Sequence, residues 1–96
     1  MAVYMMFIRE EPVRDAQEMA QYSQLNRASA ADFALEPLVV YGDIEAVEGE
    51  APDGMVMLRF DTAEQARAWY HSRAYQAALP HRLKAADYRV MIVQGL

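Results

Sequence analysis

The 96-residue chain contains no cysteine, which excludes disulfides and a cysteine nucleophile. No apolar run approaches the roughly 18 residues that a membrane-spanning helix needs, and the apolar beginning MAVYMMFIREE lacks the basic region and cleavage site of a signal peptide. Basic residues are scarce, with 9 Lys and Arg against 14 Asp and Glu, and the resulting net charge of −5 opposes binding to nucleic-acid phosphates. We therefore expect a cytoplasmic protein that binds neither nucleic acid nor membrane.

Motifs of known catalytic sites are also lacking. The chain has no P-loop, no Gly-x-Gly-x-x-Gly, no Gly-x-Ser-x-Gly and no His-Glu-x-x-His. Its two histidines, His71 and His81, are separated by an expected helix break, and their spacing is not typical of metal ligands. The sequence therefore predicts no cofactor and no metal.

The composition that is present is typical of one small folded domain. Apolar residues make up 54% of the chain and charged residues 24%, so we expect a single α+β domain over residues 1–96. Four segments have the pattern of strands: Val3–Ile8, Leu38–Glu48, Met55–Phe60 and Tyr88–Gln94. The first and third are apolar on both faces, except at Arg59. Gly42, inside the second, predicts a bulge or bend.

Helical segments follow the first and third strands. Asp15 is an N-cap candidate with Glu18 at the capping-box position, and its helix is expected to run to about residue 32. In the later segment, both Thr62 and Ser72 have the character of N-caps, which predicts two short helices. Pro80 is expected to kink the second of these.

The element order β-α-β-β-α-β predicts a ferredoxin-like fold, a four-stranded antiparallel sheet with both helical segments on one face. The other face is still apolar in at least three strands, and no further segment of the chain is available to cover it. Exposed apolar faces of this size are typical of interaction surfaces. We therefore expect a homodimer that packs through the helix-free sheet face.

The run from Phe60 to Gln76 resembles the signature of the domain of unknown function 1330 family. Matching positions are Phe60, Glu64, Ala66, Trp69, Tyr70, Ser72, Tyr75 and Gln76, followed by Arg82, Ala85 and Ala86. Residues 42–49 resemble that family's Gly-x-Val-Glu-x-Leu-Glu-Gly strand. The resemblance implies a ferredoxin-like domain that forms a dimeric α+β barrel. It implies no particular chemistry, because the family has no agreed activity.

Two arginines are candidates for holding an acidic ligand. Arg59 lies next to Phe60 and therefore on the opposite face of its strand, toward the expected dimer interface. It either pairs with Asp43 or Glu45, across strands or between subunits, or binds an anion. It also departs from the family, in which an acidic residue is common at this position. Arg82 has the same two interpretations on the later helical segment.

Aromatic side chains in both helical segments form the core or the walls of a pocket between helices and sheet. Polar Asn26 lies near the inward stripe of the first helix and either faces that pocket or flanks the stripe. The predicted ligand-binding residues are Arg59, Arg82, Tyr22, Asn26, Trp69 and Tyr75.

Two classes of function stay open. The first is a small-molecule binder, with an organic acid as one option for its ligand. Were it a cofactor-free enzyme, His71 or His81 would supply acid–base chemistry while Arg59 or Arg82 held the acid group; each histidine is equally typical of a helix end or a solvated surface. The second is a non-catalytic dimeric scaffold or regulatory accessory module. A cavity with convergent polar groups distinguishes the two classes.

Overall fold

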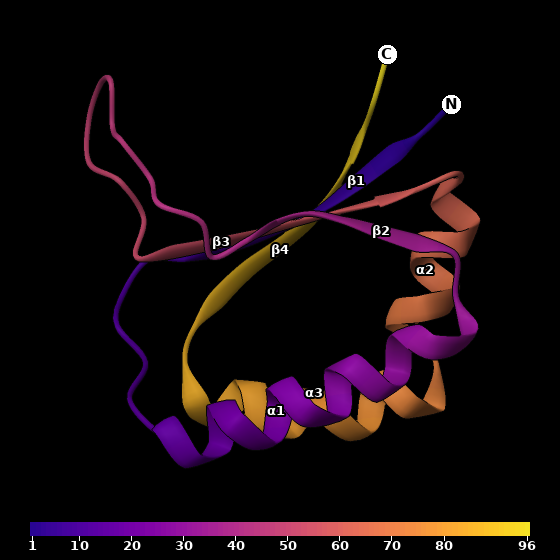
Figure 1. Ribbon diagram of the computed structural model, residues 1–96, viewed down its shortest axis with the longest axis horizontal. Helices are drawn as coiled ribbons and strands as arrows, with labels where there is room; N and C mark the ends of the chain where they lie inside the picture. Colours follow the sequence, from indigo (N-terminus) through magenta and orange to yellow (C-terminus); the bar gives the residue numbers. More distant parts are fainter.

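A four-stranded sheet forms one layer of the structure, and all the helices lie on one side of it (Figure 1). The computed structural model describes residues 1–96 without a gap. Its elements in chain order are β1 Val3–Arg9, α1 Ala16–Ser29, a 3₁₀ turn Ala30–Asp32, β2 Leu35–Val40, β3 Gly54–Phe60, α2 Ala63–Tyr70, α3 Arg73–Ala85 and β4 Tyr88–Gln94. No helix has the length and apolar character needed to cross a membrane.

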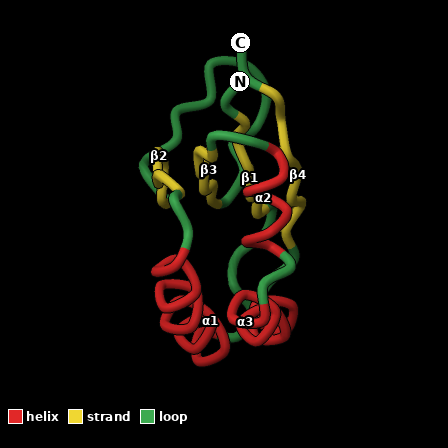
Figure 2. Tube along the Cα trace, turned by 90° about the vertical axis from the view of Figure 1, so that its right-hand side faces the viewer, coloured by secondary structure: helices red, strands yellow, loops and turns green.

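The strands follow the spatial order β2-β3-β1-β4, and every neighbouring pair is antiparallel. This order confirms the predicted ferredoxin-like fold. Figure 2, which views the sheet along its strands, shows this order and places α1 below the β2 side and α3 below the β4 side. Strand β1 lies inside the sheet and pairs with both β3 and β4. Met5 of β1 lies opposite Leu58 on β3 and Ile92 on β4.

Alternation along β1 divides the sheet into two different faces. Val3, Met5 and Phe7 point to the helices and are buried, as expected from the period of two in a strand. The opposite, helix-free face carries an almost continuous apolar surface from three strands. Its members are Tyr4, Met6, Ile8, Met55, Met57, Met91 and Val93. This face is the one that the sequence predicts to bind a second copy.

Three side-chain caps fix where the helices begin. Asp15 accepts hydrogen bonds from the backbone N–H groups of Gln17 and Glu18, and Thr62 accepts one from Gln65. Ser72 accepts the N–H of Tyr75 while its own hydroxyl donates to the carbonyl of Trp69. The predicted division of the later segment into two helices is therefore confirmed, because Ser72 ends one helix and starts the next.

The short helix α2 separates the α1–α3 layer from part of the sheet. It packs against β1, β3 and β4, whereas α1 packs mainly against α3. Figure 1 shows α2 running from the sheet down to the layer of α1 and α3. Trp69, at the end of α2, fills the space between the layers and is only 1% exposed. Strand β2 has no such helix packed against it.

The second strand differs from its predicted range of 38–48. It is shorter and earlier, and Pro37 lies inside it, with a register shift between Pro37 and Val39. Proline is tolerated here because β2 is an edge strand that needs no ladder hydrogen bond on its outer side. Residues 41–53 form a long loop instead of a strand, and it is Tyr41, at φ 54°, that turns the chain, not a bulge at Gly42.

Candidate functional site

A cavity of about 320 Å³ lies between the helical layer and the β2–β3 half of the sheet. That volume is at the lower end of the range typical of small-molecule sites. Most of the lining is apolar, and the sheet side consists of Phe7, Leu35, Pro37, Val40, Val56, Leu58 and Tyr88. Helix α2 packs against β1, β3 and β4, whereas no helix packs extensively against β2, and the cavity lies over this side of the sheet.

The polar side of the cavity comes from α1. Tyr22, Ser23, Asn26 and Arg27 all line it, and their i, i+1, i+4, i+5 spacing puts them on one face of a helix. The Oδ1 atom of Asn26 is buried without a hydrogen-bond partner. Buried polar atoms in folded proteins are nearly always paired, so this amide oxygen is an unsatisfied acceptor on a side chain that lines the cavity.

Arg82 of α3 is the most buried charged residue of the chain, at 3% exposure. Its Nε atom is buried without a hydrogen-bond partner. The guanidinium carbon lies 5.8, 6.0 and 5.2 Å from the ring centres of Phe7, Tyr22 and Tyr88. Cation–π contacts offset part of the cost of burying a charge, but they do not satisfy an N–H donor.

Trp69 is held in the cavity wall by a hydrogen bond to α1. Its indole Nε1 donates to Ser29 Oγ at 3.2 Å, and that hydroxyl in turn donates to the backbone carbonyl of Asn26 at 2.7 Å. Ser29 is therefore a buried structural partner of Trp69 and does not line the cavity.

Two phenols connect α1 to α3 beside the cavity. The hydroxyls of Tyr22 and Tyr75 lie 2.9 Å apart, and their rings meet edge to face. Burial raises the pKa of both, and the neighbouring phenol raises that of Tyr22 further. Both tyrosines are therefore neutral near pH 7, and neither supplies a negative charge to Arg82.

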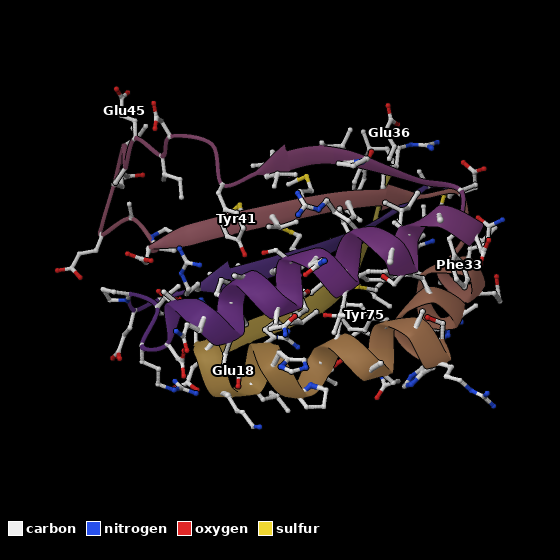
Figure 3. The ribbon with its side chains drawn as sticks, turned by 60° about the horizontal axis from the view of Figure 1, so that its bottom comes forward. Glu18, Phe33, Glu36, Tyr41, Glu45 and Tyr75 are labelled. Atoms are coloured by element: carbon white, nitrogen blue, oxygen red, sulfur yellow. The ribbon has the colours of Figure 1, made fainter.

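One end of the cavity is bounded by four residues, of which the sequence predicted only Tyr41 as a possible pocket wall; Arg9, Asp53 and Tyr88 were not assigned to the site. Arg9 donates to Asp53 and to the hydroxyl of Tyr88, and the Tyr88 hydroxyl lies 2.7 Å from that of Tyr41. Arg9 also stacks over the ring of Tyr41, 5.0 Å from its centre. Figure 3 shows Tyr41 turned toward the interior, whereas Glu45 stands at the outer end of the same loop.

The predicted ligand-binding residues fall into two groups. Tyr22, Asn26, Trp69 and Arg82 line the cavity, and Tyr75 is completely buried next to Tyr22. Whether they bind a ligand stays a prediction.

Arg59 lies elsewhere, on the helix-free side of β3, where it pairs with Asp61 at 2.9 Å. Its expected cross-strand partners, Asp43 and Glu45, are in the loop and not on β2, because the strand ends at Val40. Asp61 follows Arg59 by two residues, so this ion pair forms regardless of how β2 pairs with β3.

Neither histidine reaches the cavity. His71, at the C-terminal end of α2, is exposed and lines a separate shallow hollow beside β4. His81 of α3 hydrogen-bonds Glu18 of α1 through its Nδ1 and does not line the cavity. The structure therefore does not bring a histidine together with Arg82, and Arg59 is on the opposite side of the sheet. No cluster of three His, Asp or Glu side chains is placed to hold a metal ion.

The topology and the cavity together define a ferredoxin-like α+β domain with an internal site between its two layers. The family described as Domain of unknown function (DUF1330) matches residues 3–96, and the chain belongs to this family. Among functionally curated proteins, none matches the chain.

Solved structures with the same fold are distant in sequence. A protein of unknown function from Rhodopseudomonas palustris superposes with a TM-score of 0.77 at 14% identity, covering 99% of this chain and 82% of that one. A member of the ethyl tert-butyl ether d (EthD) family from Bacillus halodurans C-125 gives a TM-score of 0.68 at 16% identity over 100% of both chains. A dimeric ferredoxin-like protein of unknown function from Bacteroides fragilis NCTC 9343 gives 0.64 at 12% identity, over 98% and 96%.

Proposed function

We propose that this protein is a cytoplasmic homodimer in which each subunit binds a small organic molecule in the cavity between α1 and the β2–β3 half of the sheet. The observation that carries the proposal is the coincidence of two unsatisfied buried polar atoms, Asn26 Oδ1 and Arg82 Nε, at one cavity. A scaffold protein with a close-packed interior would contain neither a cavity of this size nor unpaired buried polar atoms.

The apolar helix-free face supports the dimeric part of the proposal. Seven apolar side chains of this face come from β1, β3 and β4 and have no helix over them. Met91 and Val93 are 36% and 42% exposed, on a face where burial by a second sheet would remove them from water. One structural neighbour is itself described as dimeric. Dimerisation through this face leaves the cavity free, since the cavity lies on the other side of the sheet.

The lining favours binding over acid–base catalysis by a histidine. It offers a cation, phenols and an amide, and the two histidines are outside it. A structural neighbour whose family is named after a small organic ether is in keeping with a small organic ligand. The rival function, a scaffold with no ligand, predicts that no compound enters the cavity.

The proposal is tested by following Trp69, the only tryptophan of the chain and a residue of the cavity wall. We expect members of a small-molecule fragment library to change its fluorescence and to raise the melting temperature. Ala30 lines the cavity, so Ala30→Phe should abolish both effects. Ala20→Phe, on the exposed side of α1, is the matched control. Fragments that bind Ala30→Phe as well as the wild type, or no binding at all, would favour the scaffold.

A further inference from the structure

Arg82 is a buried cation for which the protein provides no counter-ion. It forms no ion pair with any Asp or Glu, although five other arginines of the chain do. A charge that is 97% buried normally has a partner of opposite sign, because desolvation of an unpaired ion costs several kcal/mol. A bound molecule with a negative charge would therefore supply the counter-ion that Arg82 lacks.

The charge around the cavity is opposite to that of the whole protein. The chain carries a net charge of −5, yet the lining contains two arginines, Arg27 and Arg82, and no Asp or Glu. The phenol of Tyr22 does not compensate, because burial raises its pKa and keeps it protonated. Arg9, at the edge of the site, already pairs with Asp53. The cavity is thus a local positive site in an acidic protein.

The surroundings of Arg82 also restrict the shape of the molecule. Aromatic rings of Phe7, Tyr22 and Tyr88 surround its guanidinium, and Trp69 lines the same cavity. Walls of this kind favour a flat aromatic body, which stacks or packs edge to face. Asn26 Oδ1 adds one acceptor that needs a donor from the ligand.

We infer that the ligand is an aromatic hydroxycarboxylic acid, whose carboxylate pairs with the guanidinium of Arg82 and whose hydroxyl hydrogen-bonds the side-chain amide of Asn26. This inference rests on the proposed function of the cavity and names the ligand class. The carboxylate neutralises the buried guanidinium, the ring packs against the aromatic walls, and the hydroxyl pairs with the amide. Each part of the ligand thus matches one unsatisfied or apolar feature of the lining.

Three related compounds separate these contributions. They are 4-hydroxyphenylacetate, its neutral amide 4-hydroxyphenylacetamide, and phenylacetate, which lacks the hydroxyl. Dissociation constants are measured by calorimetry on the intact protein, with Trp69 fluorescence as a second readout. We expect the amide to bind on the order of 10- to 100-fold more weakly than the acid, because a charge-assisted hydrogen bond is lost. Loss of the hydroxyl should weaken binding about 5- to 10-fold.

Substitution of Arg82 tests the anchor directly. Arg82→Met keeps most of the side-chain volume and should bind the acid and the amide equally weakly. Arg73→Met is the matched control, an exposed arginine on the same helix that should leave all three affinities unchanged. In the wild type, the Arg82 Nε–H resonance should shift with the acid and not with the amide, a measurement that stands even where the variant fails to fold.

Two negative results are distinguishable. Equal affinity of acid and amide, with no shift at Arg82 Nε–H, would overturn the ligand class and leave the cavity as a binding site. Failure of these three compounds and of the fragment library to perturb Trp69 would overturn the proposed function itself.

Discussion

The hydroxyls of Tyr22 and Tyr75 form a hydrogen bond that joins α1 to α3 in the buried interior beside the cavity. Both side chains are buried, with Tyr22 6% and Tyr75 0% exposed. Loss of either hydroxyl therefore removes a buried hydrogen-bond partner from the other. This mutual dependence has consequences that substitution and pH reveal separately.

Tyr22→Phe should destabilise the protein by about 1–3 kcal/mol, because it leaves the Tyr75 hydroxyl buried without its partner. Removing both hydroxyls in Tyr22→Phe/Tyr75→Phe should cost less than the sum of the single changes, since no orphaned group remains. Urea unfolding of the four proteins measures the coupling. Strict additivity would mean that the two hydroxyls do not interact in solution.

The same pair should make stability fall at alkaline pH. Burial raises the pKa of Tyr22 and Tyr75 in the folded state, whereas the unfolded chain ionises its tyrosines near pH ~10. Above that pH the unfolded state binds fewer protons, so the free energy of unfolding decreases by about 1.4 kcal/mol per pH unit for each such tyrosine. Unfolding curves between about pH 8 and 11 measure this slope. The double Phe variant should have a shallower slope, and an unchanged slope would contradict the assignment.

At the residue level, strand parity and helix periodicity predicted which side chains face inward, and Tyr22, Asn26, Trp69 and Arg82 do line one cavity. The same parity put Arg59 correctly on the helix-free face. The predicted cross-strand pairing with Asp43 or Glu45 was wrong, because it required a strand that the chain does not form. The roles of Arg9 and Asp53 depend on contacts between segments far apart in sequence, which no local pattern contains.

At the scale of the elements, the corner between α2 and α3 positions Trp69 in the wall of the cavity. Ser72 caps α3 and closes the last turn of α2 in a single side chain, and Trp69 and Tyr75 lie on either side of it. The two rings are 4.3 Å apart, centre to centre. Capping chemistry is local, so this division was predictable. The range of β2 was not, because an edge strand tolerates proline and its loop carries apolar residues without pairing.

Ser72→Ala should destabilise the protein by about 1–2 kcal/mol through loss of the N-cap. Because Trp69 and Tyr75 flank the corner, we also expect the near-ultraviolet circular dichroism to weaken. Ser72→Thr keeps the capping hydroxyl and should restore most of the stability. An alanine variant with wild-type stability would show that packing alone holds the corner.

For the whole molecule, the two faces of one sheet have separate tasks in the proposed arrangement. The helix-covered face contains the cavity, and the helix-free face packs on the second subunit. The order of elements was sufficient to predict that the helical segments cover only one face of the sheet. The size of the cavity could not be predicted, because it depends on how segments far apart in the sequence pack together.

Met6→Glu should convert the proposed dimer to a monomer. Met6 lies on the central strand of the helix-free face, between Met57 on β3 and Met91 on β4, so a charge there would be buried in the interface at a cost of several kcal/mol. Light scattering coupled to size exclusion measures the mass, and circular dichroism checks that the variant folds. Ala20→Glu adds the same charge on exposed α1 and should stay dimeric. A dimer that persists in Met6→Glu would move the interface elsewhere.

The strand order has a consequence for biosynthesis. β1 is synthesised first among the strands, yet it is central and pairs with β4, in which Gln94 lies opposite Val3. Until β4 has been synthesised, the edge of β1 that pairs with β4 is therefore unpaired, and β1 has apolar side chains on both faces. Such a strand is prone to aggregate or to be held by a chaperone until its partner arrives. Yield in rapid, high-level expression should consequently be limited by events on the nascent chain more than by the stability of the finished fold.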